Sequence, residues 1–268
     1  MYRIQNSKTK NFKRMVVMSD LHCAHQLGLT PPSWQYDKDN KELESVSKRQ
    51  REAWDWYVNT INLIGEDIDI LVVNGDCIDG PGKRNGGVEL ITTDMLQQCN
   101  MAIECIKQWS PKSTIIISGT EYHTGNAEQF EEVIAERLGA EFHNQVDIKV
   151  NGKIFNFRHK VGSSGVPYGK STQVIKEAIW QQLKKQYFSE EVADVIIRSH
   201  VHYMNINQDS MRYSITTPAL QLNSRYGIKQ CSGYTDFGFL VFDIYNNGKI
   251  DIKPYIADIK EKQNIIEV

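Results

Sequence analysis

Aspartate and histidine residues recur along this chain just after segments that the sequence pattern marks as strands. The sequence holds seven histidines, and five of them occupy such positions. The ligand-type residues in this pattern are Asp20, His22, Asp76, His123, His159, His200 and His202. Ligand sites of α/β sheets gather at the carboxyl ends of strands, so we expect the fold to bring these side chains together.

Two of these pairs have a spacing that suits a shared metal ion. In an extended chain residues i and i+2 point to the same side, which applies to Asp20 with His22 and to His200 with His202. Either pair alone occurs by chance, and such histidines also cap helices or fill polar gaps. Their ordered recurrence favours metal binding. Imidazole with carboxylate suits Zn²⁺, Mn²⁺ or Fe. Six such ligands are too many for one catalytic ion and suit two ions about 3.5–4 Å apart, bridged by a carboxylate such as Asp76.

The strands and helices that must position these residues are predicted to alternate along the chain, which is typical of an α/β fold. Buried strands are predicted at 15–18, 69–73, 113–118 and 193–198, with hairpins over 147–158 and 238–256. Helices are predicted over 45–64, with Trp54 and Tyr57 inward, and over 171–187. In the second helix Val174, Ala178, Ile179 and Leu183 are predicted to face inward.

Composition narrows the class of protein. The 268 residues are 40% hydrophobic and show no linker or repeat, which predicts a single domain over residues 1–268. A net charge of −2 gives no overall positive field that would bind a polyanion nonspecifically.

No apolar run is long enough for a membrane span or a secretory signal, so we expect no membrane partner and a cytoplasmic protein. Five cysteines without a CxxC pair predict reduced thiols.

Five short blocks resemble those of the calcineurin-like metallophosphoesterase family, over residues 15 to 202. They are Ser19-Asp20-Leu21-His22, Asn74-Gly75-Asp76-Cys77-Ile78-Asp79, Gly119-Thr120-Glu121-Tyr122-His123, His159 and Ser199-His200-Val201-His202. The stretch 19–32 is similar to phage- or prophage-encoded members. The resemblance implies an α/β fold of two mixed β-sheets packed as a sandwich and flanked by helices.

The resemblance also implies a binuclear site. Asp20, His22 and His202 would hold one divalent ion, His159 and His200 the second, and Asp76 would bridge them. His123 matches the catalytic histidine that is not a ligand, and Asp79 is predicted to orient a ligating histidine rather than bind metal. The expected ions are Mn, Zn, Fe or Ni, with Mn favoured.

The third block departs from the family pattern, which has Asn after the glycine as a ligand of the second ion. Here Thr120 follows Gly119, and the histidine comes two positions later than expected. Thr120 could supply a weaker oxygen ligand, Glu121 could replace the Asn, or water could fill the position. A Glu121 ligand would cancel the positive charge that attracts phosphate, which favours Thr120 or water, with Glu121 turned elsewhere.

The predicted function is hydrolysis of a phosphomonoester or phosphodiester of nucleotide or nucleic-acid type, by a water that two metal ions activate. One alternative is a metallonuclease for single-stranded DNA, because other members of the family that the sequence resembles cut DNA. Lys48, Arg49 and Arg51 lie beside aromatic residues, but Trp54 and Tyr57 are predicted to face inward, which favours a solvated basic helix face over a nucleic-acid surface. An alternative of another class is a non-catalytic metal-binding interaction module, which the altered third block allows.

Residues 164–171 match most positions of the nucleotide-binding P-loop motif GxxxxGK(S/T). Ser164 stands where the motif needs glycine, and Pro167 removes an amide that would contact phosphate. A milder role is that Lys170 and Ser171, at the start of the predicted helix, bind a phosphate of the substrate.

Overall fold

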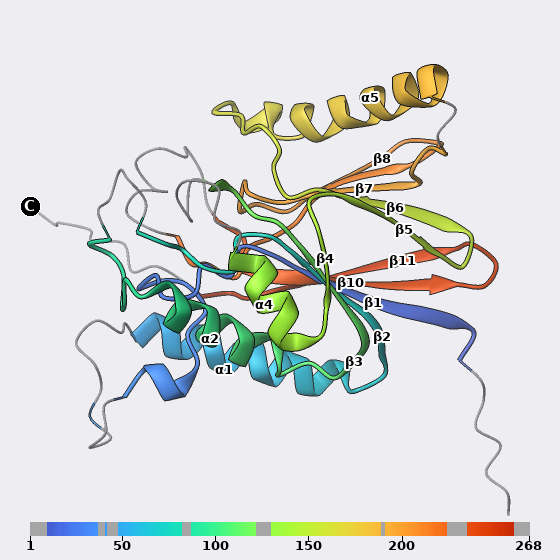
Figure 1. The fold of residues 1–268 in the computed structure, drawn as a ribbon. Coiled ribbons are helices and arrows are strands. Elements are labelled where there is room, and N and C mark those ends of the chain that lie inside the picture. The colour runs from blue at the N-terminus through green and yellow to red at the C-terminus, as the bar shows by residue number, and fades with distance from the viewer. Residues whose placement is uncertain are drawn as a thin grey trace, which may run out of the picture.

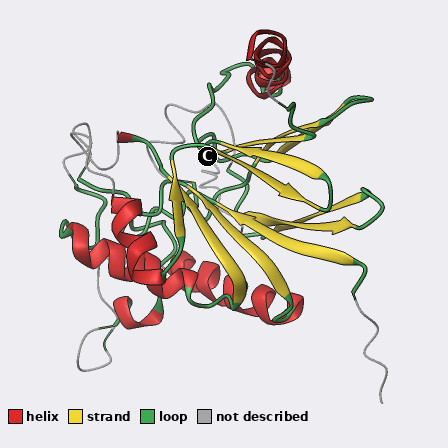
Figure 2. Ribbon diagram, turned by 45° about the vertical axis from the view of Figure 1, so that its right-hand side comes forward, coloured by secondary structure: helices red, strands yellow, loops and turns green. Residues whose placement is uncertain are grey.

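The computed structural model describes residues 10–36, 41, 48–81, 87–121, 130–188, 191–223 and 235–259. Two mixed β-sheets pack face to face, and helices cover their outer faces (Figures 1 and 2). The predicted sandwich of two mixed sheets is thereby confirmed.

The first sheet has six strands in the order β11-β10-β1-β2-β3-β4. Its strands are β1 (Phe12–Met18), β2 (Ile68–Asn74), β3 (Pro111–Ile117), β4 (Glu141–His143), β10 (Gly238–Tyr245) and β11 (Ile250–Ile256). The β1, β2, β3 and β4 strands are parallel, and the β10–β11 hairpin pairs antiparallel to β1. The carboxyl ends of β1, β2 and β3 therefore meet at one edge of the sandwich.

The second sheet has five strands in the order β5-β6-β7-β9-β8. Its strands are β5 (Val146–Val150), β6 (Lys153–Phe157), β7 (Val195–Arg198), β8 (Asn205–Gln208) and β9 (Tyr213–Thr216). Strands β6, β7 and β9 are parallel, while β5 and β8 pair antiparallel at the two edges. His159 follows β6, and His200 and His202 follow β7, so three of the predicted ligands lie after strands of this sheet.

Helices divide between the two outer faces. The described helices are α1 (Lys48–Ile64), α2 (Met95–Ile106), α4 (Phe130–Leu138) and α5 (Thr172–Phe188), with 3-10 turns η1 (Pro32–Trp34) and η2 (Pro167–Gly169). The α1, α2 and α4 helices cover the first sheet, and α5 lies alone over the second (Figure 1). None of the helices in the described ranges is long and apolar enough to cross a membrane.

The alternation of side chains along β1 shows how the core is built. Val16 and Met18 point toward the helices, whereas Met15 and Val17 point into the space between the sheets, as the two-residue period of a strand requires. The inter-sheet core also contains Phe155 from the second sheet, packed edge-on at 5.7 Å against the ring of Phe242 from the first.

The inward prediction is correct for α1 and partly wrong for α5. Trp54 and Tyr57 are buried, as is Val174. Ile179 and Leu183, however, are exposed, because α5 turns a different stripe toward the sheet, in which Glu177 pairs with the buried Arg198 of β7. Cysteines 23, 77, 99 and 105 are buried free thiols, as predicted, and Cys231 lies outside the described residues.

Candidate metal centre

The structure brings all six predicted ligands together in two adjacent clusters. Each cluster offers three ligand atoms that lie within 4.8 Å of one another. The first consists of Asp20, His22 and His202, and the second of Asp76, His159 and His200. Strands from both sheets contribute to each cluster, so the site exists only once the sandwich has formed.

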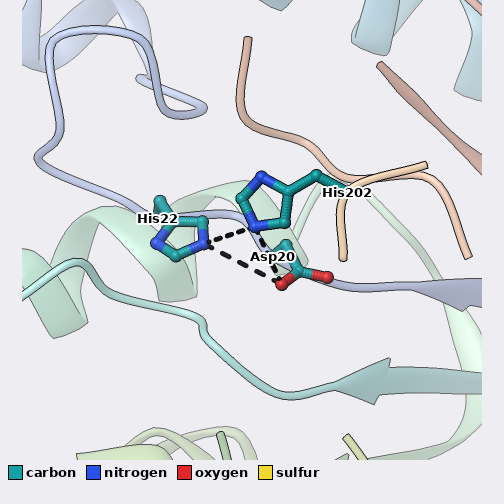
Figure 3. A group of neighbouring side chains, drawn as sticks. All are labelled: Asp20, His22 and His202. Carbon is teal, nitrogen blue, oxygen red and sulfur yellow. Dashed lines mark hydrogen bonds and ion pairs between the residues drawn. The ribbon is translucent and has the colours of Figure 1, made fainter. Parts of the chain in front are cut away.

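In the first cluster three ligand atoms converge on one small space (Figure 3). Asp20 Oδ1 lies 3.2 Å from His202 Nε2 and 3.9 Å from His22 Nε2. The two imidazole nitrogens lie 3.1 Å from each other. A carboxylate oxygen and two imidazole nitrogens are a ligand set typical of zinc and other first-row transition metals.

The second cluster is adjacent to the first. Asp76 Oδ2 lies 2.9 Å from His159 Nε2 and 3.8 Å from His200 Nδ1. Asp20 Oδ1 of the first cluster lies 3.8 Å from His159 Nε2. Asp20 Oδ1 and His159 Nε2 are both buried, and their polar contacts with described residues are to other ligand atoms of the two clusters. Buried polar atoms need partners, and a cation bound between these ligand atoms would satisfy them.

The backbone at these positions is strained. Five candidate ligands have positive φ angles, a conformation that side-chain-bearing residues seldom adopt. They are Asp20 (52°), His22 (44°), Asp76 (50°), His200 (74°) and His202 (57°). Each such residue costs about 1–3 kcal/mol, and strain of this kind concentrates at functional sites. The concentration of strained residues on predicted ligands therefore supports a functional site.

Polar groups behind the clusters fix the orientation of two imidazoles. His22 Nδ1 lies 2.9 Å from Asp79 Oδ1, and His159 Nδ1 lies 2.6 Å from the carbonyl oxygen of Asn74. A carbonyl accepts but cannot donate, so in the neutral ring of His159 the proton sits on Nδ1, which leaves a lone pair on Nε2 for a metal. Asp79 thus stands behind a ligand-type histidine and is absent from both clusters.

Replacing Asp79 by Ala should weaken metal binding without removing a ligand. Carboxylates that orient a ligating histidine are commonly worth about 10–100-fold in metal affinity, and we expect a loss in that range. Titration of metal-free protein with Zn²⁺ in a calorimeter measures it. Asp79→Asn, which can still accept from His22 Nδ1, should lose less. An unchanged affinity in Asp79→Ala would contradict this role.

Thr120 contacts the carboxylate of Asp76. Its backbone N–H donates to Asp76 Oδ1 over 2.6 Å, and its hydroxyl lies 3.1 and 3.2 Å from the two carboxylate oxygens. Thr120 therefore holds Asp76 Oδ1 on one side and leaves Oδ2 directed at His159. Glu121 is exposed and belongs to neither cluster.

Sequence reasoning gave no role to three residues that shape this region. A Cβ on Gly119 would lie 2.2 Å from Asp76 Oδ1, and one on Gly75 would lie 2.5 Å from His159 Nδ1, so only glycine fits at either place. Glu131 of α4 is buried behind Asp76 and accepts from the backbone N–H of Cys77. The positions of the two glycines beside block residues were visible in the sequence, whereas the contact of Glu131 depends on the packing of α4.

The charged side chains of the two clusters shift one another's pKa values. Burial disfavours the charged form of Asp20, but the imidazoles of His202 and His159 outweigh it and hold the pKa of Asp20 well below its ordinary value. Burial also opposes protonation of His22 and His159, yet the neighbouring carboxylates raise the pKa of His22 to about 10 and that of His159 to about 9. Both histidines are protonated at neutral pH without metal, so binding a cation must release protons.

The remaining predicted site residues have other partners or lie outside the described residues. His123 falls in the range 122–129, which the structure does not describe. The ammonium of Lys170 lies 4.6 Å from the ring centre of Tyr203, and the hydroxyl of Ser171 donates to Asn205. In the P-loop-like segment the amides of Val166 and Gly169 bond within the segment, so they are not free for a phosphate.

Comparisons with known proteins give matches only among solved structures. No family model matches this sequence, and no curated protein matches it. Zn²⁺-bound Vps29 from Entamoeba histolytica has 10% identity and a TM-score of 0.45, with 91% of this chain and 98% of that chain covered. A novel archaeal phosphodiesterase has 11% identity and a TM-score of 0.43, with 90% and 99% covered. Likenesses with TM-scores of 0.45 and 0.43 show nothing about the function of this chain.

Proposed function

We propose that this chain is a metal-dependent phosphoester hydrolase of the calcineurin-like metallophosphoesterase family. The observation that carries the proposal is the adjacency of the two Asp/His clusters, in which the buried atoms Asp20 Oδ1 and His159 Nε2 lie 3.8 Å apart. The motif order in the sequence, the two-sheet fold and the strained ligand backbone agree with it. The substrate we propose is a phosphomonoester or phosphodiester of nucleotide or nucleic-acid type.

The residues present fit two divalent cations. Asp20, His22 and His202 would hold one, and Asp76, His159 and His200 the other, with Mn²⁺ or Zn²⁺ compatible with such mixed ligands. Bound there, the two ions would supply an activated water and electrostatic stabilisation of the phosphoryl oxygens. Two carboxylates do not cancel the charge of two divalent ions, so the site would keep a net positive charge that attracts a phosphate.

The chain's own residues set the geometry for this chemistry. Thr120 fixes the rotation of the Asp76 carboxylate, while Asp79 and the Asn74 carbonyl aim the rings of His22 and His159. His200 and His202 are partly exposed, whereas Asp20, Asp76 and His159 are buried. A phosphate can therefore approach from the side of the two partly exposed histidines. In the proposal His123 donates a proton to the leaving alkoxide, a role worth about 10²–10⁴ in rate.

The test combines metal analysis with a substrate screen on the full chain. Metal-free protein is loaded with Mn²⁺ or Zn²⁺, and bound metal is counted by elemental analysis. The loaded protein is then assayed on aryl phosphomonoesters, aryl phosphodiesters, a cyclic nucleotide and labelled single-stranded DNA. We expect close to two ions per chain and hydrolysis that a chelator abolishes. Two bound ions without hydrolysis of any substrate would favour the metal-binding interaction module, and no bound metal would overturn both.

A further inference from the structure

Four buried polar side chains lie between the two sheets, at the strand ends that carry the candidate metal centre. Ser19 follows β1 and Asn74 ends β2 in the first sheet, while Ser199 follows β7 and Thr217 follows β9 in the second. All four residues have an exposed fraction of 0%, so none of them can touch a substrate. We call these four residues the inter-sheet network.

Hydrogen bonds connect the inter-sheet network from end to end. Asn74 Nδ2 lies 2.7 Å from Ser199 Oγ, and its second contact, with the carbonyl oxygen of Arg158 at 3.4 Å, identifies it as the amide nitrogen. The hydroxyl oxygen of Thr217 lies 2.7 Å from that of Ser199 and 2.8 Å from that of Ser19. The network therefore crosses from one sheet to the other twice, at its Asn74–Ser199 bond and at its Thr217–Ser19 bond.

The two ends of the network fix the direction of its hydrogen bonds. Ser19 Oγ lies 3.1 Å from the carbonyl oxygen of Pro218, which can only accept, so the single hydroxyl proton of Ser19 goes there. Thr217 must then donate to Ser19, and Ser199 must donate to Thr217. Ser199 in turn accepts from the amide of Asn74. Each of the three hydroxyls donates once and accepts once, and all the bonds point the same way.

Three members of the network are linked directly to candidate metal ligands, by a peptide bond or a hydrogen bond. These pairs are Ser19 with Asp20, Ser199 with His200, and Asn74 with His159. The first pair belongs to one cluster, and the other two belong to the second cluster. Thr217 joins Ser19 to Ser199, so its hydroxyl lies at the link between the supports of the two clusters.

We propose that Thr217 is a positioning residue, whose hydroxyl fixes the spacing between the two candidate metal clusters. The proposal rests on the proposed function, since it requires that the clusters hold two ions. Such ions lie about 3.5–4 Å apart, and a working site needs its groups placed to within about 0.5 Å. The two clusters are built from strands of different sheets, so a bond between the sheets beside the ligands is the direct way to set this spacing.

The strained backbone beside the network explains why such support is needed. Asp20 and His200 have φ angles of 52° and 74°, and each directly follows a serine of the network. Strained residues persist only where the surrounding structure fixes their conformation. Buried hydrogen bonds that all point the same way strengthen one another, which supplies that restraint. Removing the hydroxyl of Thr217 would disconnect Ser19 from Ser199 and weaken the restraint on both sides.

Thr217→Val tests the proposal, because valine has nearly the shape of threonine and lacks the hydroxyl. In this variant Ser199 loses its acceptor and Ser19 loses its donor, and both serines are too buried to bond to bulk water instead. Metal-free full-length protein is titrated with Zn²⁺ in a calorimeter. We expect the affinity for the second ion to fall about 10–100-fold, the range seen when groups that orient metal ligands are removed. Thr217→Ser keeps the hydroxyl and should recover most of the loss.

Electron paramagnetic resonance of the Mn²⁺-loaded protein provides a readout that a loss of stability alone would not change. The magnetic coupling between two Mn²⁺ ions depends on the distance and the bridging groups between them. Thr217→Val should alter this coupling, and Thr217→Ser should keep the wild-type spectrum. Thr60→Val is the matched control, because Thr60 is a buried threonine on α1 whose hydroxyl donates to the carbonyl of Trp56, far along the chain from the site. It should change neither the affinity nor the coupling.

The outcomes separate this proposal from the proposed function. A wild-type protein that binds no metal would overturn both. If wild type binds two ions and Thr217→Val keeps the same affinity and coupling, the role of Thr217 is overturned and the proposed function stands. A loss of affinity that Thr217→Ser does not recover would also overturn the proposal, because the effect would then come from packing of the threonine methyl group and not from its hydroxyl.

Discussion

Asp76→Asn should abolish metal-dependent phosphoester hydrolysis while the fold survives. The substitution removes the anionic oxygen directed at His159, which lies 2.9 Å away, and with it a ligand of the proposed second ion. The asparagine oxygen can still accept from the N–H of Thr120, so the loop after β3 keeps its hydrogen bond. Electrostatic stabilisation by a catalytic ion is worth several kcal/mol, and a loss of about 4 kcal/mol corresponds to about 10³-fold in kcat/KM.

The measurement is kcat/KM of the Mn²⁺-loaded protein on an aryl phosphodiester, with circular dichroism to check the fold. Asp55→Asn is the matched control, because Asp55 is an exposed carboxylate on α1 and should have no effect on activity. The count of bound metal separates two causes of lost activity. A variant that still binds two ions but is inactive would show that Asp76 acts on the reaction rather than on metal retention. Full activity of Asp76→Asn would exclude the binuclear mechanism.

Much of the candidate site could be predicted because strand ends are predictable. Apolar runs rich in Val and Ile marked β1, β2, β3 and β7, and the parallel arrangement carries the residues after them to one edge. The motifs then named Asp20, Asp76 and His200 without knowledge of the distances between them. The structure adds what spacing cannot give, namely that these residues separate into two clusters of three that touch through Asp20 and His159.

The supporting groups were harder to predict, because they act through backbone atoms and tertiary contacts. The carbonyl oxygen that fixes His159 belongs to Asn74, and a carbonyl carries no sequence signal. The hydroxyl of Thr120 was a candidate for a metal ligand, and the structure turns it toward the Asp76 carboxylate. Glu131 reaches the back of the site only because α4 packs beside β3.

The error on α5 has a physical cause as well. A 3.6-residue period identifies the apolar residues of a helix, but α5 has apolar residues on both sides, and the period does not tell which side meets the sheet. An ion pair decides it: Glu177 lies 2.9 Å from the guanidinium of Arg198, which is buried in β7. Rotating α5 to bury Ile179 and Leu183 would leave that guanidinium without its carboxylate, which costs more than the apolar burial gains.

Glu177→Leu should therefore be among the most destabilising single substitutions outside the site. Arg198 is 1% exposed, and burial lowers the pKa of its guanidinium to about 10, so it stays charged at neutral pH. Removing Glu177 leaves this charge hydrogen-bonded to Asn156 and to backbone carbonyls among the described residues, with Asp147 as the remaining nearby carboxylate. Breaking a buried ion pair from one side costs about 3–5 kcal/mol, and we expect about 3 kcal/mol here, since Asn156 retains part of the compensation. Urea unfolding measures the change.

Arg158→Leu provides the matched control, because Arg158 pairs with the same Glu177 carboxylate but its side chain is 40% exposed. Exposed ion pairs contribute about 0–1 kcal/mol, so Arg158→Leu should cost far less than Glu177→Leu. Combining Glu177→Leu with Arg198→Met removes both charges and should restore most of the lost stability. Equal costs for Glu177→Leu and Arg158→Leu, or no recovery in the double variant, would show that α5 is held by packing alone. Because His200 lies two residues after Arg198, the same variants also test whether the anchoring of α5 supports the second cluster, through their Zn²⁺ affinity.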